Sequence, residues 1–281
     1  VTDIGQFSSL VLGADGFSRI AYYSVSRGDL RFARCLNIDC ASRNIFTVDS
    51  TNDTGKYTSV ALGSDGFARI SYQNETSDDL KMSRCLTIDC QAANNNNIDT
   101  TGDVGSLKTN IAMGSDGFAR ISYYDDTADD LKFVRCTSID CNLKVITIVD
   151  SVNNVGKYNS MQLGSDGFAR ISYWGDGDMK FVRCTNADCT AKVISATDPE
   201  GSDVGHYSSL RLGSDGFGRI SYYDNAIPRL KFARCRDQDC SPANPQIDIA
   251  MSFRPTITAT ITQADLFLRK VGNPANPTLR L

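Results

Sequence analysis

A short stretch of sequence recurs along this chain of 281 residues at a period of about fifty. It reads LGSDGFARISY from Leu62 to Tyr72 and returns three times with few changes, while a looser copy, LGADGFSRIAY, begins at Leu12. The Asp-Gly pairs of the copies fall at Asp15, Asp65, Asp116, Asp166 and Asp215. Five copies of one unit favour a fold assembled from repeats, because each copy is expected to adopt the same local structure.

One unit, such as residues 105–154, predicts four short β-strands. Its runs SLKTNIAM, FARISYY, DLKFVRC and LKVITIVD are rich in aliphatic and aromatic residues and are separated by turn formers. No run is long enough and periodic enough for a helix. The Asp-Gly pair between the first two runs indicates a tight hairpin, because glycine supplies the positive φ that such turns require.

Four antiparallel strands in every fifty residues, repeated in tandem, resemble the β-propeller repeat proteins over residues 5 to about 250. The resemblance implies an all-β ring of four-stranded blades around a central channel, with the first strand of each blade innermost. The blades would span about 5–54, 55–104, 105–155, 156–204 and 205–250. The chain has neither a Trp-Asp closing pair nor a kelch double glycine, and GSDGFARISY is only reminiscent of the Asp-box of sialidases. The resemblance therefore implies no particular family chemistry.

The last residues, 251–281, predict two or three strands of a degenerate sixth blade. The run DLFLRKV, from Asp265 to Val271, is similar to the third-strand text DLKFVRC without its cysteine. Such a segment is expected to complete a sheet, either in the same ring or in a neighbouring molecule. We therefore consider first a structural protein that assembles with itself outside the cell, potentially into filaments. The candidate assembly residues are Thr256, Ile257, Ile261, Leu266, Leu268 and Leu279.

Cysteine usage predicts disulfides and an extracellular location. All ten cysteines form C-x4-C pairs, one pair in each repeat. Zinc is disfavoured because the chain has one histidine and each repeat offers two thiols where a structural site needs four ligands. The predicted bridges are Cys35–Cys40, Cys85–Cys90, Cys136–Cys141, Cys184–Cys189 and Cys235–Cys240. Oxidised pairs place a protein outside a reducing cytosol, so we expect secretion, with any signal peptide already removed.

Charge and hydropathy exclude two classes of partner. The net charge is −4, and the basic residues are spread through the repeats, so nucleic acid is an unsuitable partner. No apolar run approaches the ~20 residues that span a bilayer, so we expect no membrane span.

Two arginines and one further aspartate recur in every copy. Because an active site is needed once, we interpret them as Arg–carboxylate pairs that fix each blade to itself or to its neighbour, and not as an anion-binding cluster of the sialidase type. The arginines are Arg19, Arg69, Arg120, Arg170 and Arg219 after the turn and Arg34, Arg84, Arg135, Arg183 and Arg234 before the first cysteine. The aspartates before the second cysteine are Asp39, Asp89, Asp140, Asp188 and Asp239.

The connections between second and third strands vary most and hold the ligand candidates. Aromatic faces beside carboxylates can stack on sugars while accepting hydrogen bonds from their hydroxyl groups, which is typical of a lectin, the second hypothesis. The same acidic loops could collect calcium through oxygen ligands, or could be plain solvated turns; we expect no other cofactor or metal. The candidates are Tyr23, Tyr124, Trp174 and Tyr223 with Asp125, Asp176 and Asp224. Asn52 and Asn74 begin N-glycosylation sequons.

The sequence offers little for catalysis. His206 is the only histidine, and the other repeats place Gln6, Lys56, Ser106 and Lys157 at its position. No nucleophile elbow, zinc-protease motif or phosphate loop is present. We expect no enzyme, and keep a sialidase-like glycosidase with paired carboxylates as the third hypothesis.

Overall fold

The structure, a computed structural model, describes residues 5–199, 203–241 and 246–250. The chain divides into two units, Val1–Ala250 and Met251–Leu281. The second unit lies outside the described residues, and so do the predicted sixth blade and all six candidate assembly residues.

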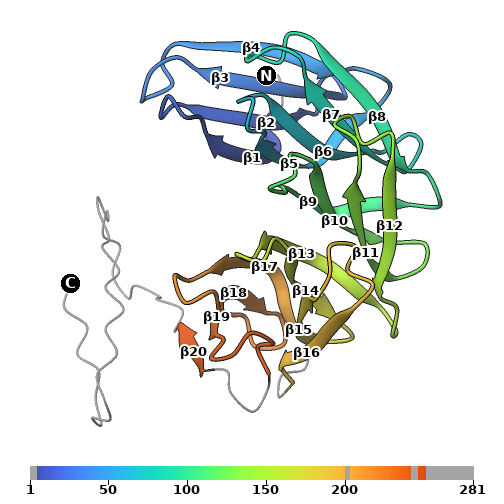
Figure 1. Cartoon of the computed structure of the whole chain (residues 1–281), viewed down its shortest axis with the longest axis vertical. Coiled ribbons are helices and arrows are strands. Elements are labelled where there is room, and N and C mark those ends of the chain that lie inside the picture. Colours follow the sequence, from blue (N-terminus) through green and yellow to red (C-terminus); the bar gives the residue numbers. More distant parts are fainter. Residues whose placement is uncertain (1–4, 200–202, 242–245, 251–281) are drawn as a thin grey trace. The chain divides into compact units, whose positions relative to one another are not determined.

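The described residues form five four-stranded antiparallel sheets, each with its strands in chain order, as the repeats predict (Figure 1). Blade 1 contains β1 (Gln6–Leu12), β2 (Ser18–Ser24), β3 (Asp29–Cys35) and β4 (Arg43–Asp49). Blade 2 contains β5 (Thr54–Leu62), β6 (Ala68–Asn74), β7 (Asp79–Cys85) and β8 (Ala93–Asp99). Blade 3 contains β9 (Val104–Met113), β10 (Ala119–Asp125), β11 (Asp130–Cys136) and β12 (Lys144–Asp150). Blade 4 contains β13 (Val155–Leu163), β14 (Ala169–Gly175), β15 (Asp178–Cys184) and β16 (Lys192–Asp198). Blade 5 contains β17 (Val204–Leu212), β18 (Gly218–Asp224), β19 (Arg229–Arg234) and β20 (Gln246–Ala250).

The Asp-Gly pair forms the turn between the first two strands of each blade. In blade 1 the amide of Gly16 donates to the carbonyl of Gly13 at 2.9 Å, and Gly16 has a φ of +78°. The carboxylate of Asp15 accepts the amide of Phe17 at 3.1 Å and so fixes the far side of the turn. Glycine is required here because a side chain at this φ would be strained.

The five predicted disulfides are confirmed. Each joins the two cysteines of one repeat, with Cα atoms 4.6 to 4.7 Å apart, and closes the loop between the third and fourth strands. The bridges lie at the same place in every blade. Each one constrains a single loop of its own blade and does not join one blade to another.

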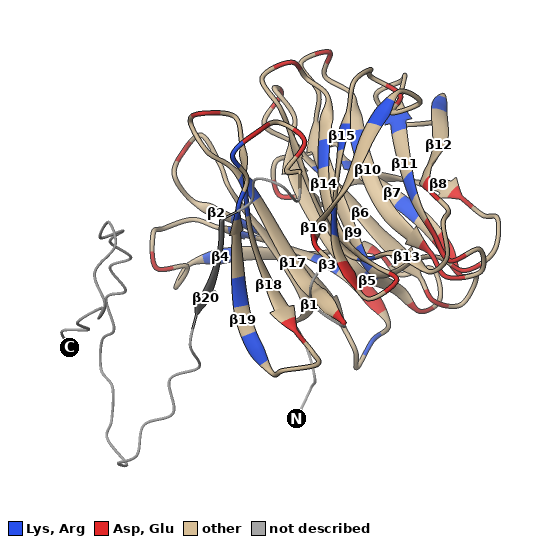
Figure 2. Ribbon diagram, turned by 90° about the horizontal axis from the view of Figure 1, so that it is seen from below, with Lys and Arg blue, Asp and Glu red and all other residues tan. Residues whose placement is uncertain are grey.

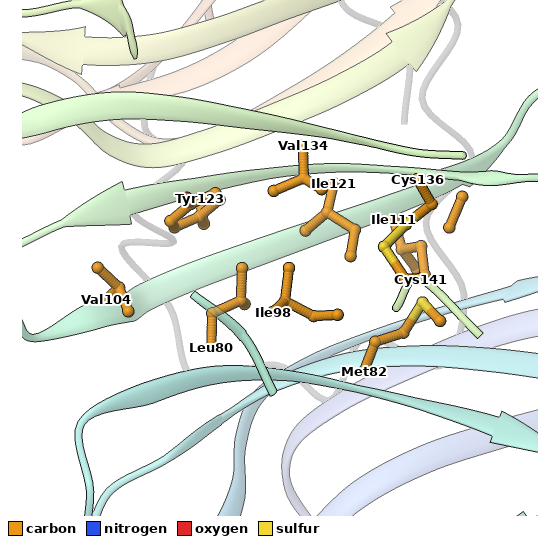
Figure 3. Close-up of a cluster of buried hydrophobic side chains, with 11 residues drawn as sticks. Leu80, Met82, Ile98, Val104, Ile111, Ile121, Tyr123, Val134, Cys136 and Cys141 are labelled. Atoms are coloured by element: carbon orange, nitrogen blue, oxygen red, sulfur yellow. A yellow bond between two sulfur atoms is a disulfide. The ribbon is translucent and has the colours of Figure 1, made fainter. Parts of the chain in front are cut away.

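The hydrophobic core lies between blades. The first strands β1, β5, β9, β13 and β17 contact one another in succession, on the inner side of the array (Figure 1). One cluster joins Leu80 and Met82 of blade 2 to Ile111, Ile121 and Tyr123 of blade 3 (Figure 3). Each sheet of blades 2 to 4 therefore buries one face against the preceding blade and the other against the following blade.

The repeated arginines form the predicted pairs. Within a blade, Arg69 binds both oxygens of Asp65 at 2.7 and 2.8 Å, and the other four blades carry the equivalent ion pair. Between blades, Arg34 reaches Asp89 of the next cysteine loop at 3.1 Å. The same bridge recurs as Arg84–Asp140, Arg135–Asp188 and Arg183–Asp239. Figure 2 shows many acidic residues in the connections and many basic residues along the strands. The interpretation as packing elements is confirmed.

A buried aspartate at the end of the fourth strand of blades 1 to 4 forms a second link between blades. Asp99 of blade 2 accepts the hydroxyl of Tyr123 at 2.7 Å and the ammonium of Lys132 at 3.2 Å, both from blade 3. Burial raises the pKa of Asp99, but the bonds from Tyr123 and Lys132 outweigh it and lower the pKa below its usual value. The same pairing recurs at Asp49, Asp150 and Asp198.

Candidate functional site

The variable connections gather on one face of the blades. The amide of Asp53, between blades 1 and 2, donates to the hydroxyl of Thr76 in the β6–β7 turn at 3.1 Å. The amide of Asp103 donates to the hydroxyl of Thr127 in the β10–β11 turn at 2.7 Å. Connections between blades and turns within blades therefore form a common surface, which we call the variable face.

A polar bond closes each junction between blades on the variable face. It runs from the second strand of one blade to an aspartate or asparagine just before the next first strand. The bonds join Tyr23 Oη to Asp53 (2.5 Å), Gln73 Nε2 to Asp103 (2.7 Å) and Trp174 Nε1 to Asp203 (3.0 Å). At the junction of blades 3 and 4 the link is indirect: Tyr124 Oη donates to Asp129 of its own blade, and Asn154 Nδ2 donates to the same carboxylate at 2.5 Å. Sequence reasoning missed these acceptors, although the signal is visible: every copy carries one two residues before a glycine, in NDTG, GDVG, NNVG and SDVG.

Each first strand bulges at the same place and brings an aromatic residue to this face in four of the five blades. The residues are Phe7, Tyr57, Leu107, Tyr158 and Tyr207, with φ between 51° and 61°. Positive φ is uncommon for bulky residues and costs on the order of 1–3 kcal/mol. Phe7 contacts Tyr57 with ring centroids 4.5 Å apart, and Tyr158 contacts Tyr207 at 4.6 Å. These rings were also missed by sequence reasoning.

The largest group of rings lies at the junction of blades 4 and 5. We call Tyr158, Trp174, Asp203, His206 and Tyr207 the Trp174 cluster. The His206 ring lies 4.9 Å from Tyr158 and 5.7 Å from Trp174, centroid to centroid. His206 Nε2 lies 2.7 Å from Asp203, the carboxylate that also accepts Trp174 Nε1. Three blade elements, β13, β14 and β17, therefore contribute to one site.

The Trp174 cluster is open to solvent. The Tyr207 side chain is 68% exposed, and Trp174 and Asp203 are partly exposed. The ammonium of Lys157 lies 5.4 Å from the Trp174 ring centroid, within the range of a cation–π contact. The site thus presents apolar ring faces, a cation and a carboxylate together.

Asp203 is held as a carboxylate. Its Oδ2 accepts a hydrogen bond from the side-chain amide of Asn225 at 2.6 Å. The bond from Asn225, followed by that with His206, lowers the pKa of Asp203 below its usual value. The site therefore keeps a negative hydrogen-bond acceptor at neutral and mildly acidic pH.

The other junctions are equipped differently. Between blades 1 and 2, Lys56 lies 5.6 Å from the Tyr23 ring centroid and pairs with Glu75 at 3.2 Å and Asp53 at 3.4 Å. Burial lowers the pKa of Lys56, but these carboxylates outweigh it and raise the pKa overall. Between blades 2 and 3, Gln73 and Leu107 take the aromatic positions. Ring content on the variable face thus changes from junction to junction.

Two predicted ligand residues are not available to a ligand. Asp125 is 2% exposed and accepts the amides of Thr127 and Ala128 while pairing with Lys132 at 2.6 Å. Asp224 is also 2% exposed, and pairs with Arg229 at 2.9 Å. These carboxylates close the turn of their own blade. The expectation that the two carboxylates face solvent is wrong, because the oxygens of a turn-capping aspartate accept hydrogen bonds from backbone amides.

The remaining predicted residues are placed unevenly. Tyr23 and Tyr124 are buried, and burial followed by a neighbouring carboxylate raises the pKa of both hydroxyls well above the usual range. Tyr223 is partly exposed. Asp176 is exposed and accepts a hydrogen bond from the side-chain amide of Asn153 at 2.7 Å. Of the predicted residues, the structure brings only Trp174 into the cluster defined above.

The described part of the chain supports neither a metal centre nor a helical membrane span. Within it, no group of three or more His, Cys, Asp or Glu side chains is arranged to hold a metal ion, so the calcium alternative gains no support. It also contains no helix that is long and apolar enough to cross a membrane.

Comparison with known proteins defines the fold as that of a β-propeller. No protein-family model and no curated protein matches the chain. Among solved structures it is similar to a protein of unknown function from Dyadobacter fermentans, at 10% identity and TM-score 0.59 over 89% of this chain and 83% of that one. It is similar to Aleuria aurantia lectin in complex with α-methyl-L-fucoside, at 14% identity and TM-score 0.55 over 90% and 81%. It is also similar to an α-L-arabinofuranosidase from Fusarium graminearum in complex with an iminosugar inhibitor, at 10% identity and TM-score 0.56 over 87% and 80%.

These neighbours correct one expectation. The prediction that the protein is not an enzyme is wrong as an exclusion, because glycoside hydrolases share its fold. At 10–14% identity these neighbours show the fold alone, and no finding supports a self-assembling structural role. The five disulfides indicate an extracellular or secreted protein.

Proposed function

We propose that this chain is a secreted glycan-binding protein and that a saccharide binds at the Trp174 cluster. One observation carries the proposal: at the junction of blades 4 and 5 the rings of Trp174 and of the exposed Tyr207 both lie beside the His206 ring, at 5.7 and 6.1 Å between centroids, and His206 contacts the ionised Asp203. Lectin structures with the same fold add support at the level of architecture.

The chemistry of the cluster suits a neutral sugar. A pyranose or furanose ring has C–H faces that pack on aromatic rings, while its hydroxyl groups need charged or polar partners. Asp203 accepts three hydrogen bonds from Trp174, His206 and Asn225. A carboxylate offers about four acceptor positions, so one remains for a sugar hydroxyl. Lys157 can donate to a second hydroxyl.

The only tryptophan of the chain lies in the site and reports on binding. A glycan array identifies the saccharide, and titration of that saccharide is then followed by the fluorescence of Trp174. We expect Tyr207→Ala to weaken binding roughly two- to tenfold, the effect of losing one aromatic contact of about 0.5–1.5 kcal/mol.

Leu107→Ala is the matched control, because Leu107 occupies the same bulge with the same positive φ but lies at the junction without rings. Chromatography of the saccharide after incubation shows whether it is released intact or cleaved. An array without signal would overturn the assignment of the site. So would array binding, which needs no tryptophan, that is equally unaffected by Tyr207→Ala and Trp174→Ala.

A further inference from the structure

The junction between consecutive blades is built four times from the same contacts. One contact is the arginine bridge to the next cysteine loop, from Arg34–Asp89 to Arg183–Asp239. Another is a close approach of a first-strand glycine to the preceding third strand. A Cβ atom on Gly55 would lie 2.7 Å from the Cα of Leu30, so no other residue fits against that strand. Both contacts belong to the packing between blades, and each needs one half from either side.

Blade 1 carries one half of this junction without a partner. Leu10 of β1 is 57% exposed, whereas its equivalents Val60, Ile111, Met161 and Leu210 are at most 8% exposed. A Cβ on Gly5, the equivalent of Gly55, would meet nothing within 4 Å. The carboxylate of Asp39 is exposed and, among the residues that the structure describes, accepts only the nearby amide of Ala41, at 3.2 Å.

A buried polar atom on the same side of blade 1 also lacks a partner. Arg31 occupies the position at which the other blades carry a lysine paired with the aspartate of the preceding blade, as Lys81 pairs with Asp49. The Nε of Arg31 is buried and has no hydrogen-bond partner among the described residues. Blade 1 is therefore prepared for a preceding blade.

Blade 5 carries the other half. Leu230 of β19 is 52% exposed, whereas its four equivalents, Leu30, Leu80, Leu131 and Met179, are fully buried. Arg234 is exposed and forms no ion pair with the described residues, whereas the four equivalent arginines each bind the next cysteine loop. Blade 5 therefore presents an arginine and a leucine, and blade 1 presents an aspartate and a glycine.

We propose that a second copy of this chain docks head to tail, with blade 5 of one copy against blade 1 of the next. Arg234 would pair with Asp39 of the other copy, and Leu230 would cover Gly5 and Leu10. The argument for this partner is complementarity: the arginine and leucine of blade 5 and the aspartate and glycine of blade 1 are the separated halves of contacts that the chain already forms four times. The buried aspartate is the exception, because Ala250 of blade 5 stands where the other fourth strands carry it. Because the two surfaces differ, the contact is heterologous and yields a closed ring or a filament of copies. The proposal uses neither the glycan site nor residues 251–281.

Charge reversal tests the pairing in the chain of 281 residues. Arg234→Glu and Asp39→Arg each place like charges in the proposed contact. The double variant restores opposite charges, and so does an equimolar mixture of the two single variants. Asp126→Arg, at an exposed position in the β10–β11 turn of blade 3, reverses a charge on a blade outside the proposed contact and serves as the control. The mass of each sample is measured over a range of concentrations by analytical ultracentrifugation, and circular dichroism verifies that each variant is folded.

We expect the wild type and the Asp126→Arg control to associate as concentration rises. Each single reversal should weaken association about tenfold or more, since like charges across an interface are strongly unfavourable. The double variant and the mixture should regain most of the affinity. A wild-type chain that stays monomeric at all concentrations would overturn the proposal. Association that ignores both single reversals, or that fails to recover in the mixture, would overturn it as well.

Discussion

Replacing Asp150 by asparagine tests the buried links between blades. Asp150 accepts the hydroxyl of Tyr173 at 2.8 Å and the ammonium of Lys180 at 3.4 Å. Asparagine keeps the volume and can still accept from Tyr173, but it leaves Lys180 without a carboxylate ion pair in the described part of the chain. Breaking a buried pair costs about 3–5 kcal/mol. The Lys180 side chain is 16% exposed and keeps some hydration, so we expect about 3 kcal/mol.

Asp99→Asn is the matched control at the preceding junction. There Lys132 has a second carboxylate, Asp125, at 2.6 Å, which replaces the lost charge. Blade 4 has Gly175 at the position of Asp125, so Lys180 has no such reserve. We expect a loss of about 1.5 kcal/mol for Asp99→Asn, the value of one hydrogen bond to a charged group.

Calorimetry and urea unfolding with the disulfides intact measure both variants. At about 2–4 °C per kcal/mol for a domain of this size, Tm should fall by roughly 6–12 °C for Asp150→Asn and by about 3–6 °C for Asp99→Asn. Equal losses, or a larger loss for Asp99→Asn, would refute the reasoning, because the second carboxylate would then have no compensating effect.

Three further predictions concern the repeated elements. In urea unfolding of the monomer, Gly156→Ala should destabilise the fold by at least about 1–3 kcal/mol more than Gly5→Ala. Both glycines have positive φ, but a Cβ on Gly156 would lie 2.7 Å from the Cα of Leu131, whereas a Cβ on Gly5 meets open space. Similar losses for the two variants would contradict the close approach. Arg19 holds the pKa of Asp15 at about 2, below the unfolded value of about 3.9, so its contribution to stability is complete above pH 4 and disappears as the pH falls towards 2; a loss of Tm that began above pH 5 would point to other groups. Replacing Cys136 and Cys141 together by alanine should cost about 2 kcal/mol through the short loop that their bridge closes, and a loss below about 0.5 kcal/mol would show that the loop is held by its hydrogen bonds alone.

The sequence predicted features that every repeat needs. Asp-Gly turns, cysteine bridges and the Arg–Asp pairs within blades recur five times, and the Arg–Asp pairs between blades recur four times. Their structural role depends on short-range geometry, or on residue types that have few other possible partners. The candidate site was harder to predict. Trp174 was identified, but Asp203 and Tyr207 were not. Both come from the next blade, and Tyr207 lies in a bulge of β17 that sequence periodicity does not show. Asp125 was misplaced because an acidic turn residue serves equally well as a turn cap or as a ligand.

The variable face can change its chemistry without loss of the fold because the junction there demands little from the side chain. Tyr23, Gln73 and Trp174 differ in size and in aromatic character, yet each donates one hydrogen bond to the aspartate before the next first strand. The backbone at the junction is held separately, by bonds such as that from the amide of Val204 to the carbonyl of Gly177 at 2.8 Å. A donor is therefore required at this position, and the rest of the side chain is free to vary. In the Trp174 cluster the residue that closes the junction also contacts the partly exposed His206 ring of the next first strand, and that ring lies beside the exposed Tyr207.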